Sequence, residues 1–149
     1  MNTLHFDVIE QRDAYSGKDY LAVHILVDGV DLLDRIIAIE SASGGKEKEE
    51  SGAPPFEGLE PVYLFKNLTR MNVNEDNTTT VLECICHSEG CCDFVTEIIE
   101  NDDTVVWTDF KRAIDLGYYY SSLNGMEFDK EEYWREVERL KDYFGQKQE

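Results

Sequence analysis

The four cysteines of this chain lie in one short segment, as Cys84, Cys86, Cys91 and Cys92. Zinc prefers four nitrogen or sulfur ligands arranged as a tetrahedron. Cys84 and Cys86 are two apart on an expected strand and so point to the same side, but Cys91 and Cys92 are adjacent and neither pair has the spacing of a zinc knuckle. The spacing therefore favours small buried residues around a glycine-containing turn over a zinc site.

A redox pair such as Cys86 with Cys91 is the second chemical use that this segment offers. Such a pair needs a thiolate, and the acidic neighbours Glu83, Glu89 and Asp93 disfavour the negatively charged sulfur. A cysteine-based metal or redox site thus stays the alternative reading of the chain. Hydrolytic and phosphate-binding motifs are absent, and the only histidines are His5, His24 and His87.

Aromatic residues provide the best candidates for binding a partner. Tyr118, Tyr119 and Tyr120 follow one another in the segment GYYYSSLNG, and Trp107 and Asp109 lie just before it. Tyrosine and tryptophan are enriched at protein interfaces, so we expect these five residues to contact a partner. Two plainer alternatives remain open, namely that one or two tyrosines pack over a sheet edge and that Asp109 belongs to a solvated strand edge.

Asp109 also has an enzymatic interpretation, as half of a carboxylate pair with Asp103 or Glu97. A carboxylate-based hydrolase is the least supported of the functions considered, because acids are so numerous that such pairs arise by chance. His5 and His24 lie on the two strands of an expected hairpin and could be neighbours across it. Together these patterns lean away from an enzyme.

Alternating apolar residues predict a hairpin at the beginning of the chain, with strands over 4–10 and 20–27. Asp31 has the character of a helix N-cap, and the residues after it carry an apolar stripe that includes Ile36 and Glu40. A strand over 36–39 is the alternative there.

The second half of the chain predicts a short helix over 61–71, started by Pro61, and then three strands over 78–86, 94–100 and 104–110. These strands follow one another without a helix, which indicates an antiparallel meander.

The last helix carries the clearest local signals. Asp129 is placed as an N-cap and Glu132 at the third helical position, as in a capping box. Tyr133, Val137, Leu140 and Phe144 recur on one helical face, and Gly145 supplies a stop.

We therefore expect an α+β fold: an antiparallel sheet of about five strands, built from the hairpin and the meander and covered by the C-terminal amphipathic helix. Residues 1–149 should form a single domain, since the residues before the Ser-, Gly- and Pro-containing stretch are too few for a separate core. We expect that stretch, at about 42–58, to be a mobile surface loop.

The charge of the chain restricts its partners. Thirty-two acidic residues against fourteen basic ones give a net charge of −18. Such a field repels phosphate backbones and anionic lipids, which argues against nucleic-acid and membrane binding. A basic protein is the partner that it attracts. The first residues lack the pattern of a signal peptide, so we expect a cytoplasmic protein with reduced thiols.

A resemblance follows from four motifs taken together: V-D-G-V-D-L-L-D at 27–34, C-x-C followed by Gly90-Cys91, V-x-W-x-D-F at 105–110, and Phe128-Asp129 followed by Tyr133. In this combination the chain resembles a widespread family of small uncharacterised bacterial proteins that have a C-x-C…G-C turn before the V-x-W-x-D-F strand. His87 and Cys92 replace residues of that family's turn. The resemblance implies a bacterial, cytoplasmic single domain and no particular activity.

The function expected from the sequence is a non-enzymatic protein-binding module. Its acidic surface would attract a basic protein, and the tyrosine segment would contact it. A toxin-neutralising (immunity) protein is one concrete form of this expectation.

Overall fold

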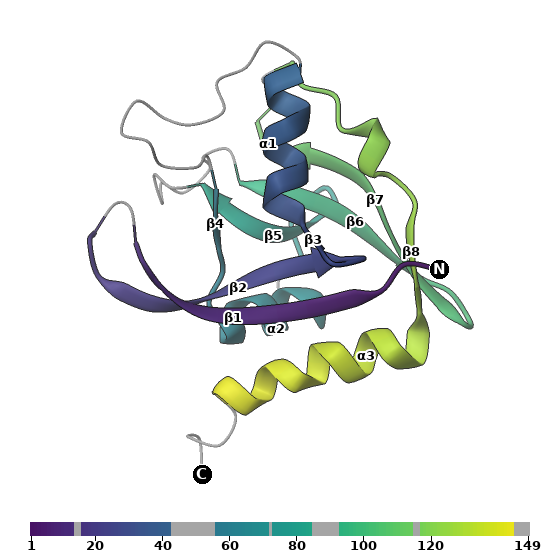
Figure 1. The fold of residues 1–149 in the computed structure, drawn as a ribbon. Coiled ribbons are helices and arrows are strands. Elements are labelled where there is room, and N and C mark those ends of the chain that lie inside the picture. The colour runs from purple at the N-terminus through teal and green to yellow at the C-terminus, as the bar shows by residue number, and fades with distance from the viewer. Residues whose placement is uncertain (14–15, 43–55, 72, 85–92, 115–116, 145–149) are drawn as a thin grey trace.

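The computed structural model describes residues 1–13, 16–42, 56–71, 73–84, 93–114 and 117–144 (Figure 1). Within them, helices and strands alternate irregularly along the chain. The elements are β1 (Leu4–Arg12), β2 (Asp19–Val27), β3 (Val30–Asp31), α1 (Leu32–Ala42), β4 (Phe56–Gly58), α2 (Pro61–Leu68), β5 (Thr79–Cys84), β6 (Phe94–Glu100), β7 (Thr104–Arg112), the 3₁₀ turn η1 (Ser121–Leu123), β8 (Met126–Asp129), α3 (Lys130–Arg139) and the 3₁₀ turn η2 (Leu140–Tyr143).

The strands confirm an α+β fold with antiparallel pairing, and they divide into two sheets. β1, β2 and β3 form one sheet, and β4 to β8 form the other in chain order. The hairpin and the meander were expected in one sheet. They lie in separate sheets because β3 pairs with the second edge of β2, and β4 pairs with the outer edge of β5. Both β3 and β4 have too few residues to show a periodic pattern in the sequence.

The two sheets are joined at closely packed positions. The Val23 amide donates to the Leu59 carbonyl at 2.8 Å, and Asn2 forms a parallel bridge with Phe128. Gly58 lies directly against β2, where a Cβ atom on it would come within 2.4 Å of the Val23 carbonyl oxygen. A side chain there would push the sheets apart, so glycine is required by packing.

The segment containing Gly58 corrects one expectation. Phe56–Gly58, placed at the end of a mobile loop by the sequence, form β4 and are buried. Phe56 supplies the reason, because its ring packs edge-on against Phe94 at 5.6 Å between centroids. At the other end of the predicted loop, Ala42 is the last residue of α1, and 43–55 lie outside the described residues.

The helices begin where the sequence indicates. Asp31 accepts a hydrogen bond from the Leu33 amide at 2.9 Å, which fixes the start of α1 as a helix rather than a strand. Pro61 is the first residue of α2. Asp129 accepts from the Glu132 amide at 3.0 Å at the start of α3. The predicted stop at Gly145 lies outside the described residues.

The core fills the space between the sheets and the helices. α3 runs below β1 and beside α2, and Tyr133 and Val137 on its inner face are buried (Figure 1). Trp107 on β7 is at the centre: its ring meets Phe128 and Tyr133 edge-on, and its indole N–H donates to the Tyr133 hydroxyl at 3.1 Å.

Candidate functional site

A hollow of about 610 Å³ opens between the end of β7 and the segment that contains the three tyrosines. We call it the tyrosine hollow. Its walls are formed by Asp76, Asp109, Phe110, Lys111, Arg112, Ala113, Tyr118, Tyr119, Tyr120, Ser121 and Asn124. It thus gathers four of the five partner-binding residues expected from the sequence.

β7 shapes the hollow through a bulge. Val95 pairs with Lys111 but Glu97 pairs with Thr108, so two residues of β7 lie opposite Thr96 alone. The Thr96 hydroxyl donates to the Thr108 carbonyl at 2.7 Å, and Asp109 has a φ of 53°. A bulge bends its strand and redirects the following side chains, which here turn into the hollow. A positive φ is uncommon outside glycine and is enriched at functional sites.

A buried ion pair fixes the floor of the hollow. The guanidinium of Arg112 donates to both carboxylate oxygens of Glu40, at 2.6 and 2.9 Å, and the Tyr120 hydroxyl donates to the same carboxylate at 2.5 Å. The side chains of Arg112 and Glu40 are only 9% and 2% exposed. Two paired N–H donors on one carboxylate hold Arg112 in a single orientation.

Burial and hydrogen bonding shift the pKa values of Arg112 and Tyr120. Burial opposes the charge of Arg112, but hydrogen bonds and the charge of Glu40 outweigh it and raise the pKa of the guanidinium. Burial, together with its hydrogen bond to Glu40, raises the pKa of the Tyr120 hydroxyl above its usual value. The arginine is therefore a charged cation and the phenol is neutral at physiological pH.

Two aromatic rings lie near the guanidinium of Arg112 in the floor. The Cζ atom of Arg112 lies 4.6 Å from the centre of the Phe56 ring and 5.5 Å from that of Tyr118. Tyr120 packs edge-on against Phe94 with centroids 5.0 Å apart. These cation–π and edge-to-face contacts help to hold the side chains of Arg112 and Tyr120 in place.

The rim differs from the floor because it is open to solvent. Tyr119 is 83% exposed. Lys111 lies 3.4 Å from a carboxylate oxygen of Asp76 and 3.9 Å from one of Asp109, both of which are exposed. Asn124 accepts from the Phe110 amide at 3.3 Å and so ties the tyrosine segment to β7. The rim offers an aromatic ring and two carboxylates, which suit a cationic side chain.

The hollow continues into a second one of about 450 Å³ across β5 and β6. The two share Asp76 and Ala113, and the second adds Glu75, Asp93 and Val95 to the acidic and apolar lining. The named walls of both hollows carry carboxylates, a lysine, an arginine and tyrosines among their polar groups.

The tyrosines expected to bind a partner have three different environments. Tyr119 is exposed, Tyr118 is half-buried against Arg112, and Tyr120 is buried with Glu40. Trp107 is fully buried in the core and cannot contact a partner, which corrects its assignment; the alternation of β7 turns it inward next to Val105. Asp109 is exposed beside Lys111, as a solvated strand residue.

Two important residues of the site are not identified by the sequence patterns. Glu40 falls in a predicted apolar helical stripe, and no predicted motif includes Arg112. A carboxylate on an otherwise apolar face signals a buried charge that needs a partner. The partner itself is 72 residues away in sequence, and no local pattern identifies it.

His5 and His24, possible neighbours across the hairpin, are not directly opposite each other. His5 is opposite Leu26, and His24 is opposite Asp7. His24 instead lies between two side chains, with Nδ1 2.9 Å from Asp31 and Nε2 3.0 Å from Gln11. Hydrogen bonding to Asp31 raises the pKa of His24.

Of the four cysteines, Cys84 alone lies within the described residues. Cys84 is buried, and its amide donates to Asp93 at 2.8 Å. Cys86, Cys91 and Cys92 lie outside the described residues, as does His87. Among the residues that the structure does describe, no cluster of three or more histidine, cysteine or acidic side chains is arranged to hold a metal ion. The metal and redox sites therefore stay predictions.

None of the helices in the described ranges has both the length and the apolar character that crossing a bilayer requires. In comparisons with known proteins, no family model, no curated protein and no solved structure matches the chain. The resemblance to the bacterial family stays a prediction.

Proposed function

We propose that this chain is a non-enzymatic protein-binding module that holds a basic partner at the tyrosine hollow. One observation carries the proposal: Tyr119 stands exposed above a floor that the Glu40–Arg112 pair holds rigid. An exposed tyrosine on a fixed support is the typical anchor of a protein interface, because it buries much area and loses little conformational entropy on binding.

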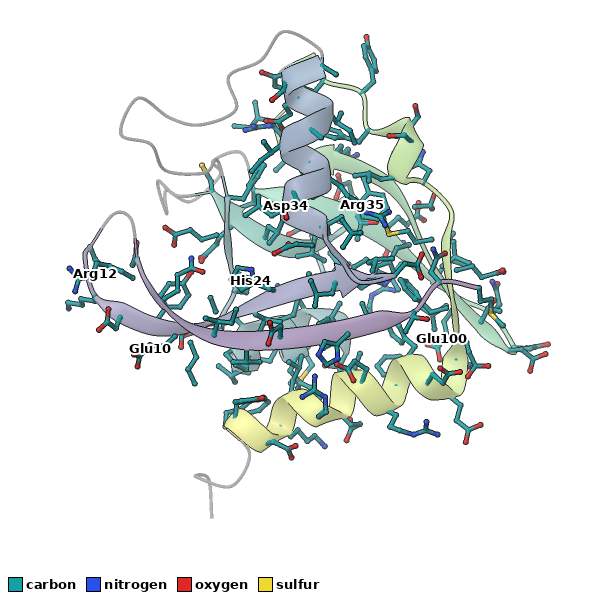
Figure 2. The ribbon with its side chains drawn as sticks, viewed as in Figure 1. Glu10, Arg12, His24, Asp34, Arg35 and Glu100 are labelled. Carbon is teal, nitrogen blue, oxygen red and sulfur yellow. The ribbon has the colours of Figure 1, made fainter. Side chains whose placement is uncertain are left out.

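The distribution of charge supports a basic partner. Exposed acids gather where the β6–β7 turn meets β8 and α3: Glu100, Asp102, Asp103, Glu127, Glu131 and Glu132. Lys130 lies among them, 3.1 Å from Glu100, and Figure 2 shows Glu100 at this end of the molecule. The chain runs from the tyrosine hollow through β8 directly to this acidic end. A basic protein seated on Tyr119 would therefore meet further carboxylates along the same side.

A toxin-neutralising protein is one form that this function would take. Such an inhibitor covers a basic surface of its target, and its acidic surface accelerates the encounter. The association would weaken as salt screens the charges, while the aromatic contact would persist.

The experiment uses three forms of the full chain: the natural protein, Tyr119→Ala and Tyr63→Ala. Tyr63 on α2 is also exposed, at 51%, but lies away from the hollow, so it is a matched control. Partners are captured from native lysate at low salt and identified, and the affinity of each purified partner is then measured by calorimetry.

We expect a basic partner whose affinity falls by about thirtyfold in Tyr119→Ala, as for an interface anchor, and is unchanged in Tyr63→Ala. Equal affinity of all three forms for every captured protein would refute the role of Tyr119.

A further inference from the structure

The free edge of β1 is a separate surface on the other sheet. Hydrogen bonds in an antiparallel pair involve alternate residues. The Asp28 amide donates to the Thr3 carbonyl and the Asp13 amide donates to the Lys18 carbonyl, so the odd-numbered residues of this stretch face β2. The N–H and C=O groups of Phe6, Val8 and Glu10 therefore point away from β2, along the outer edge.

α3 occupies this edge at Phe6 with two side chains. Glu136 accepts from the Phe6 amide at 2.6 Å, and Arg139 donates to the Phe6 carbonyl at 2.5 Å. The two side chains are themselves paired at 2.6 Å. A carboxylate and a guanidinium thus take the places of the carbonyl and amide of a neighbouring strand, which closes the edge at that residue.

The same edge is open at the next two outward residues. β1 extends past the end of α3, and Glu10 lies on this extension (Figures 1 and 2). Ile9 and Glu10 are both exposed, so neither face of the strand is covered there. Within the described part of the chain, nothing pairs with the outward amides of Val8 and Glu10. An unpaired row of backbone groups is a template for another strand.

The charge around this edge selects the occupant. Asp7 and Glu10 are exposed on β1, and Asp13 and Asp19 follow at the end of the hairpin, against Arg12 and Lys18. A second copy of this chain would bring the same acids and another −18 charges to the edge. Like charges directly opposite each other destabilise a strand pair, whereas lysine and arginine opposite them stabilise it.

We infer that the edge of β1 from Val8 to Glu10 binds an extended, basic segment of a partner protein by strand addition. The main-chain groups of Val8 and Glu10 supply the affinity, and the acids around them select lysine and arginine side chains. This surface is distinct from the tyrosine hollow and does not depend on it.

The probe is a capped seven-residue peptide of alternating lysine and valine, with a glutamate–valine peptide as its control. Binding is followed by amide NMR of the full chain. We expect the lysine peptide to shift the Val8 and Glu10 amides and to slow their hydrogen exchange. The inward Ile9 and Gln11 amides, already paired with β2, should keep their exchange rates.

Two variants separate backbone pairing from charge. Glu10→Pro removes the outward N–H group, and an edge strand tolerates proline at such a position. Glu10→Gln removes only the charge. We expect Glu10→Pro to weaken peptide binding about tenfold, the loss for one hydrogen bond left unmade, and Glu10→Gln to weaken it about threefold. Near-ultraviolet circular dichroism of buried Trp107 checks that both variants fold.

Three results would overturn the inference. They are equal binding of the glutamate peptide, peptide-induced shifts confined to the tyrosine hollow, and dimerisation of the protein through β1 in place of peptide binding. The wild-type amide shifts decide the matter even if Glu10→Pro fails to fold. Tyr119→Ala should bind the peptide as the natural chain does, so that failure of the proposed function and failure of this inference are distinguishable.

Discussion

At the scale of single residues, the floor of the tyrosine hollow depends on the buried pair of Glu40 and Arg112. Taking both charges out of water costs free energy, and their hydrogen bonds to each other and to Tyr120 offset that cost. The pair holds the floor below Tyr119, so its loss should affect both stability and binding.

Removing one member of this pair should be far worse than replacing both. Arg112→Ala leaves the carboxylate of Glu40 buried without its cation, and we expect it to lower the free energy of unfolding by about 3–5 kcal/mol. The double variant Glu40→Leu/Arg112→Met replaces both charges with apolar groups and should recover most of that loss. Urea unfolding measures both. A double variant as unstable as Arg112→Ala would contradict the explanation.

Asp109 offers a test of the bulge at the rim. Its φ of 53° suits glycine, and aspartate tolerates it better than alanine does. Asp109→Ala should therefore be about 1 kcal/mol less stable than Asp109→Gly, although both lose the same carboxylate. Thermal and urea unfolding of the two variants give the comparison, and equal stabilities would mean that the conformation imposes no strain.

At the scale of elements, local signals predicted what local forces determine. The Asp129 cap and the initial Pro61 of α2 each act within a few residues, and both are confirmed. The alternation in β1 and β2 predicted their pairing for the same reason.

Contacts between segments that are distant in the sequence could not be predicted from such local signals. β4 and β8 are three and four residues long, too short for a periodic pattern, and their places depend on partners elsewhere in the chain. The close approach of Gly58 to Val23 likewise involves two elements with no shared motif. For the site, the tyrosine segment was found because it is continuous in sequence, whereas its floor comes from α1, β4 and β7.

The start of α1 should be sensitive to pH through His24. Asp31 caps the helix with one carboxylate oxygen and contacts His24 with the other, and Asp7 and Asp34 add negative charge nearby. Because folding raises the pKa of His24 above its unfolded value near 6.5, its contribution is complete below that pH and is lost as pH rises through the folded value.

Urea unfolding of the natural chain and His24→Gln, measured from about pH 5 to about pH 8, tests this linkage. We expect the natural chain to hold an advantage of up to about 1 kcal/mol at the acidic end, the value of a modest ion pair, and to lose it toward the alkaline end. An advantage that is constant or grows with pH would be inconsistent with the Asp31 contact.

At the scale of the whole molecule, the acids of the described residues differ in their surroundings from place to place. Acids dominate the end where β6, β7 and α3 meet, whereas at the tyrosine hollow Asp76 and Asp109 share Lys111 between them. In the proposed function these two regions would have different roles. The acidic end would raise the rate of encounter with a basic protein, and Tyr119 would give the complex its lifetime.

The most direct test of this account places a photoreactive phenylalanine analogue at position 119, or at position 63 as a control, in the chain expressed in its natural cell. Irradiation should join position 119, and not position 63, to a basic protein, in a yield that falls with added salt. Cross-linking from position 63 alone, or products from position 119 that are acidic proteins, would contradict the central claim that the tyrosine hollow binds a basic partner.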